Sequence, residues 1–123
     1  MFKKGDILEA TYRELTKGYH YIIYYEGFSQ SDFIGGMITH SDINQNVKMT
    51  IDHFEVTDFH GKPYKIGYDN TYLVLAKLVK PEVWGPYRKV GELSAEGIIF
   101  FEDHIGGLRY ETFANYYKKH MNK

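Results

Sequence analysis

The triplet Thr39-His40-Ser41 follows an apolar segment and precedes a polar loop, and its side chains are of the types that perform acid–base chemistry. Histidine is the residue type best suited to give or take a proton near neutral pH, and His40 supplies an imidazole here. The hydroxyls of Thr39 and Ser41 can donate hydrogen bonds to a developing negative charge. Ser41 and Asp42 could instead cap the loop by bonding to its backbone. The triplet therefore has two interpretations, half of an acid–base site or ordinary turn chemistry.

A second histidine, His20, lies at the start of the run 19–26, which is rich in β-branched and aromatic residues. Such a run, bounded by glycines, predicts a central strand. The next predicted strand is 32–39, and His40 follows it directly. If the two strands pair as neighbours, His20 and His40 come to the same end of the sheet.

Further segments have the alternating or apolar patterns of strands, namely 5–12, 47–54 and 71–80. The last of these alternates only in part, as in a strand that is buried on both faces. Within 32–39, the Gly35-Gly36 pair predicts a bulge or a tight bend of the kind that curls a sheet.

The pattern changes in the C-terminal quarter of the chain. Segment 94–105 fits a helix that Ser94 caps and Gly106-Gly107 stop, but the apolar run 98–101 inside it fits a strand equally well. Farther on, one helical face would carry Tyr110, Phe113, Tyr117 and Met121. Strands followed by helices predict a mainly β fold of the α+β class, a small antiparallel barrel with a C-terminal helix, in one domain of residues 1–123.

Composition restricts the classes of function. The 123 residues include twelve Tyr and eight Phe, a surplus that favours strands. No cysteine is present, which excludes disulfides and thiolate chemistry, and the six histidines have no recognisable metal-ligand spacing. We therefore expect no metal or other cofactor. The first ten residues lack the apolar core of a signal peptide, and no apolar run reaches membrane-spanning length, so we expect a cytoplasmic protein without membrane contact.

Four segments are informative when they are taken in order, namely 3–10, 18–25, 36–41 and 90–97. Together they resemble segments of the PemK/MazF family of toxin endoribonucleases, whose members share an SH3-like barrel with C-terminal helical additions. The stretch "KKGDILEA" (3–10) is similar to the basic-flanked Gly-Asp-Ile strand with which family members begin. The stretch "GYHYIIYY" (18–25) stands where the family has a Gly-x-Arg-Pro strand, and "GMITHS" (36–41) matches the Ile-Thr of its Pro-x-Thr-Ser motif. Finally, "VGELSAEG" (90–97) resembles the segment that opens the family's last helix and favours helix for the residues that follow it.

The resemblance implies cleavage of single-stranded RNA, with catalysis by the family's Arg and Thr. Here the Arg position holds His20, the Thr position holds Thr39, and His40 takes the place of the following Ser. RNA is cut without a metal when its 2′-hydroxyl attacks the adjacent phosphate, which requires a base and an acid. On this hypothesis His20 and His40 move the protons, while Thr39 and Ser41 stabilise the negative charge. The family also implies a homodimer and an antitoxin protein as partner.

Several basic and aromatic residues are candidates for RNA binding. Arg13, Lys17 and Lys48 could anchor phosphates, and Trp84 with Arg88 could form a stacking and phosphate-binding edge. Trp84 could instead plug an open barrel end. The formal net charge of −1 and the missing family Arg favour an alternative, a non-catalytic SH3-like barrel that binds a protein or a nucleic-acid strand.

Overall fold

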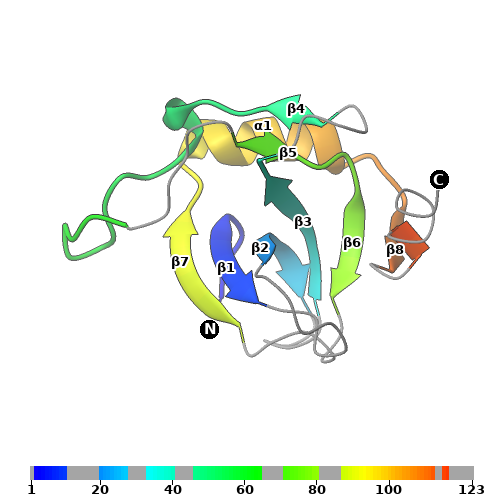
Figure 1. The fold of residues 1–123 in the computed structure, drawn as a ribbon, viewed down its shortest axis with the longest axis horizontal. Coiled ribbons are helices and arrows are strands. Elements are labelled where there is room, and N and C mark those ends of the chain that lie inside the picture. The colour runs from blue at the N-terminus through cyan, green and yellow to red at the C-terminus, as the bar shows by residue number, and fades with distance from the viewer. Residues whose placement is uncertain are drawn as a thin grey trace.

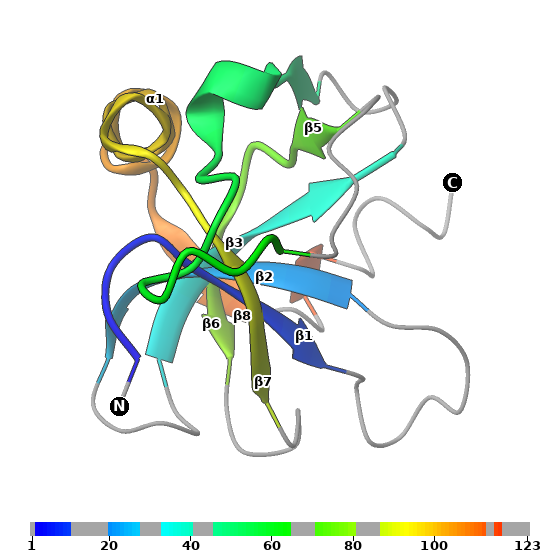
Figure 2. The same cartoon turned by 90° about the vertical axis from the view of Figure 1, so that its left-hand side faces the viewer.

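The computed structural model describes most of the chain, in seven ranges: 2–10, 20–27, 33–40, 46–64, 71–80, 87–112 and 115–116. The side chains of Ala10, His20, Val79 and Lys80 are outside that description. In these ranges one curled sheet carries a single long helix, α1 (Ala95–Ile105), on one of its faces (Figures 1 and 2). The strands are β1 (Asp6–Ala10), β2 (His20–Gly27), β3 (Phe33–Thr39), β4 (Val47–Lys48), β5 (Tyr72–Leu73), β6 (Lys77–Lys80), β7 (Arg88–Glu92) and β8 (Tyr110–Thr112).

The strand order is β4-β5-β3-β2-β1-β7, with β6 also paired to β3 and β8 paired to β6. All pairs are antiparallel except β6 with β8, so the mainly β, α+β class predicted from the sequence is confirmed. The predicted closure into a barrel is not seen among these strands, because none of the pairings joins β7 to β4, β6 or β8. Part of the outer edge of β7 is covered by the backbone of Phe54 and Glu55.

The first three predicted strands are present as β1, β2 and β3. The predicted bulge is also present, but in β2: Tyr24 lies opposite Gly35 and Glu26 opposite Ile34, so Tyr25 is the extra residue. A Cβ atom at Gly36 would lie only 2.6 Å from the ring of Phe101, which shows that α1 packs closely over this glycine.

The strand predicted over 47–54 is wrong beyond Lys48. Residues Ile51–His53 form a 3₁₀ helix, η2, instead. The backbone N–H of Thr50 donates to Nδ1 of His53 at 3.0 Å, a local bond that competes with strand pairing. Met49 is buried while Ile51 is 63% exposed, so the alternation that predicted a strand does not correspond to one buried face.

The run 71–80 forms two short strands, β5 and β6, that both pair with β3. Leu73 and Val74 are consecutive and both buried, in different core clusters. Burial on both faces of the sheet, predicted from the incomplete alternation, is therefore confirmed for this run. The sequence pattern did not predict β7.

Segment 94–105 is helical, and the Oγ of Ser94 accepts a hydrogen bond from the N–H of Gly97 at 3.1 Å, as expected for an N-cap. The second predicted helix is wrong at its beginning, since Tyr110–Thr112 is a strand in parallel register with β6. The backbone pairing of Tyr110–Thr112 with β6 outweighs the helical pattern of these side chains. Phe113, Tyr117 and Met121 lie outside the described residues.

Two core clusters lie on opposite faces of the sheet. The helix-side cluster contains Phe101 and Ile105 of α1 packed on Ile7, Ile23, Ile38 and Leu73 of the strands, together with Met49, Phe54 and Leu93. The opposite-face cluster contains Leu8, Ile22, Phe33, Met37, Val74, Ala76 and Leu78. Both faces of the sheet therefore carry buried apolar side chains. In the part of the chain that is described, no helix has the length and apolar character needed to cross a membrane.

Candidate functional site

The register between β2 and β3 determines where the predicted catalytic residues lie. Tyr21 is the Cα partner of Ile38 in this antiparallel pair. His20 precedes Tyr21 and begins β2, while Thr39 follows Ile38 and ends β3. The backbone of His20, together with Thr39 and His40, therefore lies at one end of the sheet, as the predicted pairing of these neighbouring strands requires.

The same end of the sheet continues across two more strands. Thr39 is the partner of Tyr72 in β5, and Tyr72 is in turn the partner of Lys48 in β4. Partners directly opposite one another in antiparallel strands project from the same face. We call Thr39, Tyr72 and Lys48 the strand-end row. It lies on the face away from Ile38 and Leu73, which belong to the helix-side cluster.

Within the row, a hydroxyl, a phenol ring and an ammonium stand side by side. Thr39 and Tyr72 are half-buried, and Lys48 and the adjacent His40 are exposed. Strands lie about 4.8 Å apart, so the Cα atoms of Thr39 and Lys48 are separated by about 10 Å. This arrangement offers a hydrogen-bond donor, an imidazole and a positive charge at one accessible edge.

The other predicted site residues are distributed differently. Ser41, Arg13, Lys17 and Trp84 lie outside the described residues, as does the side chain of His20. Arg88 is in β7, three strands from β3 in the sheet order. Its Nη2 lies 2.6 Å from Oε1 of Glu9, so its guanidinium is already paired with a carboxylate.

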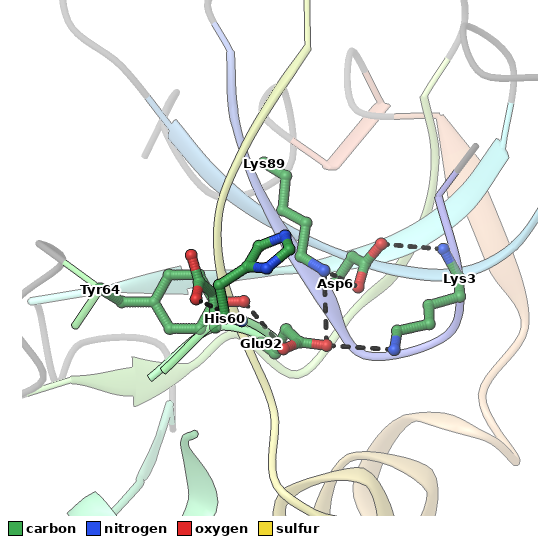
Figure 3. Close-up of polar contacts among 7 residues, drawn as sticks. Lys3, Asp6, His60, Tyr64, Lys89 and Glu92 are labelled. Atoms are coloured by element: carbon green, nitrogen blue, oxygen red, sulfur yellow. Dashed lines mark hydrogen bonds and ion pairs between the residues drawn. The ribbon is translucent and has the colours of Figure 1, made fainter. Parts of the chain in front are cut away.

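A separate polar cavity of about 480 Å³ lies between β7, the N-terminal segment and an arm formed by residues 55–64. Figure 1 shows the arm extending past β7. Glu92 lines this cavity. The hydroxyl of Tyr64 donates a hydrogen bond to its Oε2 at 2.8 Å, and the Nζ atoms of Lys3 and Lys89 lie 3.2 and 3.4 Å from its Oε1 (Figure 3). Lys89 also lies 3.1 Å from Oδ1 of the buried Asp6.

These contacts shift two pKa values. Burial alone would raise the pKa of Glu92, but the hydrogen bonds from Tyr64 and Lys3 and the charges of Lys89 and Lys3 outweigh it, so the pKa lies below its usual value. Burial, followed by the hydrogen bond to Glu92, raises the pKa of Tyr64. Glu92 is therefore a carboxylate, and Tyr64 a neutral phenol, at physiological pH.

Local hydrogen bonds to Asp58 hold the tip of the arm. Oδ1 of Asp58 accepts hydrogen bonds from the backbone N–H groups of His60 and Lys62 at 2.8 and 2.9 Å. The hydrogen bond from Lys62 lowers the pKa of Asp58 most, and the bond from His60 lowers it further. Gly61 has a φ of +80°, a backbone conformation that favours glycine. The tip presents Phe59, whose side chain is 96% exposed.

Sequence reasoning missed Tyr72 and the residues around Glu92. Tyr72 belongs to an apolar run without any catalytic signature, and only its pairing with Thr39 and Lys48 brings it to the strand-end row. Lys89 and Glu92 are three residues apart in β7, but Lys3 and Tyr64 come from distant segments that no local spacing relates to them. In the described ranges, no group of three or more histidine and acidic side chains is placed to hold a metal ion.

Comparisons with known proteins find no matching family model, and no match among curated proteins or solved structures.

Proposed function

We propose that this chain is an endoribonuclease of the PemK/MazF-like type, which cleaves single-stranded RNA without a metal. The observation that supports the proposal best is the antiparallel register of β2 and β3, with Tyr21 opposite Ile38. It places the start of β2, where His20 stands, beside the end of β3, where Thr39 and His40 stand. These are the positions at which the resemblance to the family locates catalysis.

The reaction needs two proton transfers. One imidazole accepts the proton of the RNA 2′-hydroxyl while O2′ attacks the adjacent phosphorus, and the bond from phosphorus to O5′ breaks. The other imidazole donates its proton to the departing O5′. The products are a 2′,3′-cyclic phosphate and a free 5′-hydroxyl. His20 and His40 are the proposed base and acid.

The charged phosphorane also needs stabilisation. The hydroxyl of Thr39 and that of Ser41 are the proposed hydrogen-bond donors, while Lys48, two strands away in the same row, is a proposed anchor for another phosphate of the RNA. Histidine in place of the family Arg changes the chemistry without removing it, because an imidazole can act as base or acid near neutral pH while a guanidinium stays protonated.

The proposal extends to the type of barrel and to the partners of the protein. The curled sheet with β1, β2 and β3 as consecutive neighbours suits an SH3-like barrel of this type. The protein would act in the cytoplasm as a homodimer, and an antitoxin protein would occupy its RNA-binding face. Arg13, Lys17, Trp84 and Arg88 remain the proposed contacts to RNA outside the strand-end row.

Cleavage of a mixed-sequence single-stranded RNA by the purified protein, in a chelator, tests the proposal. We expect His20→Ala and His40→Ala each to lower the rate by about 10²–10⁴-fold. The double variant should lose little more than the worse single one, because residues that act as a unit are not additive. Thr39→Ala should lower the rate without moving its pH profile, since a hydroxyl does not titrate in this range.

His60→Ala is the matched control, because it removes an imidazole from the tip of the arm and should leave the rate unchanged. If the wild-type protein fails to cut between pH 5 and pH 9, or cuts no faster than the double variant, the enzyme proposal is wrong. The non-catalytic binding module then becomes the better description.

A further inference from the structure

Tyr72 is the middle residue of the strand-end row, between Thr39 and Lys48. Its ring is half-buried. Among the described residues it is in neither core cluster, and it forms no ring pair with another aromatic side chain. The backbone of Tyr72 pairs with β3 on one side and with β4 on the other.

The other described tyrosines have evident roles or a different location. The rings that pack against the two core clusters are those of Tyr21, Tyr24, Tyr25, Tyr87 and Tyr116. Tyr64 is hydrogen-bonded to Glu92, and Tyr110 is 64% exposed on β8. Tyr72 is thus the described tyrosine that stands beside the proposed catalytic residues without serving a core cluster.

We propose that Tyr72 is the platform on which a base of the single-stranded substrate stacks, while Lys48 binds the phosphate beyond that base. This inference rests on the proposed function for the identity of the substrate. The nucleic-acid strand would cross β3, β5 and β4 roughly perpendicular to their direction. Its scissile phosphate would lie by Thr39 and His40, and the neighbouring nucleotide would lie over Tyr72.

The chemistry of the row fits this order. Every nucleic-acid base has a π-face, so an aromatic ring binds bases with little preference among them. An exposed ammonium binds phosphate as a point charge, without the directional fork of a guanidinium. The row should therefore position RNA and contribute only modestly to the choice of sequence.

Binding and cleavage by Tyr72 variants test the inference. Tyr72→Ile removes the ring but keeps a strand-forming residue, and Tyr72→Phe keeps the ring. For a non-cleavable 2′-deoxy oligonucleotide, we expect Tyr72→Ile to raise Kd by about 5-fold to 100-fold and Tyr72→Phe to change it little. For RNA, Tyr72→Ile should raise KM with kcat unchanged, because stacking holds ground state and transition state alike.

Lys48→Gln gives a second measurement that does not depend on the ring. It should weaken oligonucleotide binding and reduce the slope of log K against log salt concentration by about 1. Tyr110→Ile is the matched control, since Tyr110 is an exposed strand tyrosine away from the row. Thermal unfolding of each variant shows whether the fold is retained.

The outcomes separate this inference from the proposed function. If the wild-type protein cleaves RNA while Tyr72→Ile and Lys48→Gln leave KM and Kd unchanged, the platform is refuted and the enzyme stands. If the wild-type protein binds the oligonucleotide through Tyr72 but never cleaves RNA, the enzyme is refuted and the platform stands. Absence of any binding by the wild-type protein refutes both.

Discussion

At the scale of single residues, the side chain of Glu92 has three polar partners, Tyr64, Lys3 and Lys89. Its carboxylate accepts a hydrogen bond from Tyr64 of the arm. It also forms ion pairs with Lys3 of the N-terminal segment and Lys89 of its own strand (Figure 3). The Glu92 side chain is only 17% exposed, so these contacts are less screened than ordinary surface ion pairs. Glu92 thereby links three parts of the chain that are far apart in sequence.

Replacing Glu92 by Gln should destabilise the protein in a pH-dependent manner. The folded-state pKa of Glu92 is below its unfolded value, so its charged form stabilises the fold above the unfolded pKa of about 4.3. We expect Glu92→Gln to cost about 1–2 kcal/mol at neutral pH, the range for hydrogen bonds to a charged group that is partly buried. The difference should diminish as the pH falls through the folded pKa of Glu92.

Denaturant unfolding of both proteins between pH 3 and pH 8 measures this effect. Glu26→Gln is the control, because Glu26 is an exposed carboxylate on β2. A Glu92→Gln penalty that stays constant down to pH 3 would show that the carboxylate charge is not what stabilises the arm.

At the scale of elements, the contact between α1 and β3 determines how the sheet is covered on its helix side. Gly36 allows the ring of Phe101 to lie directly over the strand, and Phe101 is fully buried there. The N-terminus of α1 is fixed separately by Ser94, whose hydroxyl donates to the carbonyl of Asp52 in η2 at 2.6 Å. The helix is therefore anchored both to β3 and to η2.

Gly36→Ala should loosen this packing. The added methyl group would lie 2.6 Å from the Phe101 ring, closer than van der Waals contact allows. We expect a loss of about 1–3 kcal/mol in the free energy of unfolding, as for other overpacked cores. Gly107→Ala is the matched control, because a methyl group there would meet nothing within 4 Å. Equal stability of the two variants in denaturant would contradict the observed packing.

At the scale of the whole molecule, the aromatic surplus is only partly explained by the core. Several Tyr rings pack against the two clusters, but Phe59 at the tip of the arm is 96% exposed and Tyr110 on β8 is 64% exposed. Large exposed rings are commonly used in interfaces, where aromatic residues are enriched.

We therefore expect the protein to form a homodimer, as the proposed function also requires. Light scattering of the purified chain at micromolar concentration should give twice the monomer mass. Phe59→Ser should shift the equilibrium toward monomer, while Lys62→Ser, a change at an exposed residue of the same tip, should not. A monomer at all accessible concentrations would refute the prediction.

Much of the strand and helix content could be predicted from the sequence alone. β2 and β3 are dense runs of β-branched, aromatic or apolar residues, and α1 begins at a capping Ser, so their signals lie within a few residues. The neighbouring positions of His20 and His40 follow from two consecutive strands pairing, which is the commonest arrangement. The sequence therefore predicts that His20 and His40 lie at the same end of the sheet.

The remaining features of the fold and the site depend on tertiary contacts. The alternation in 47–54 predicts a strand, but Ile51–His53 form η2, and the carbonyl of His53 accepts a hydrogen bond from the N–H of Ser94 at 2.9 Å. Tyr110 lies on a predicted helical face, but pairing with β6 makes it part of a strand. Strand register places Tyr72 opposite Thr39 and Lys48. Glu92 contacts Tyr64, Lys3 and Lys89, which lie in three different segments of the chain. These outcomes depend on contacts between residues far apart in the chain, and local spacing carries no information about such contacts.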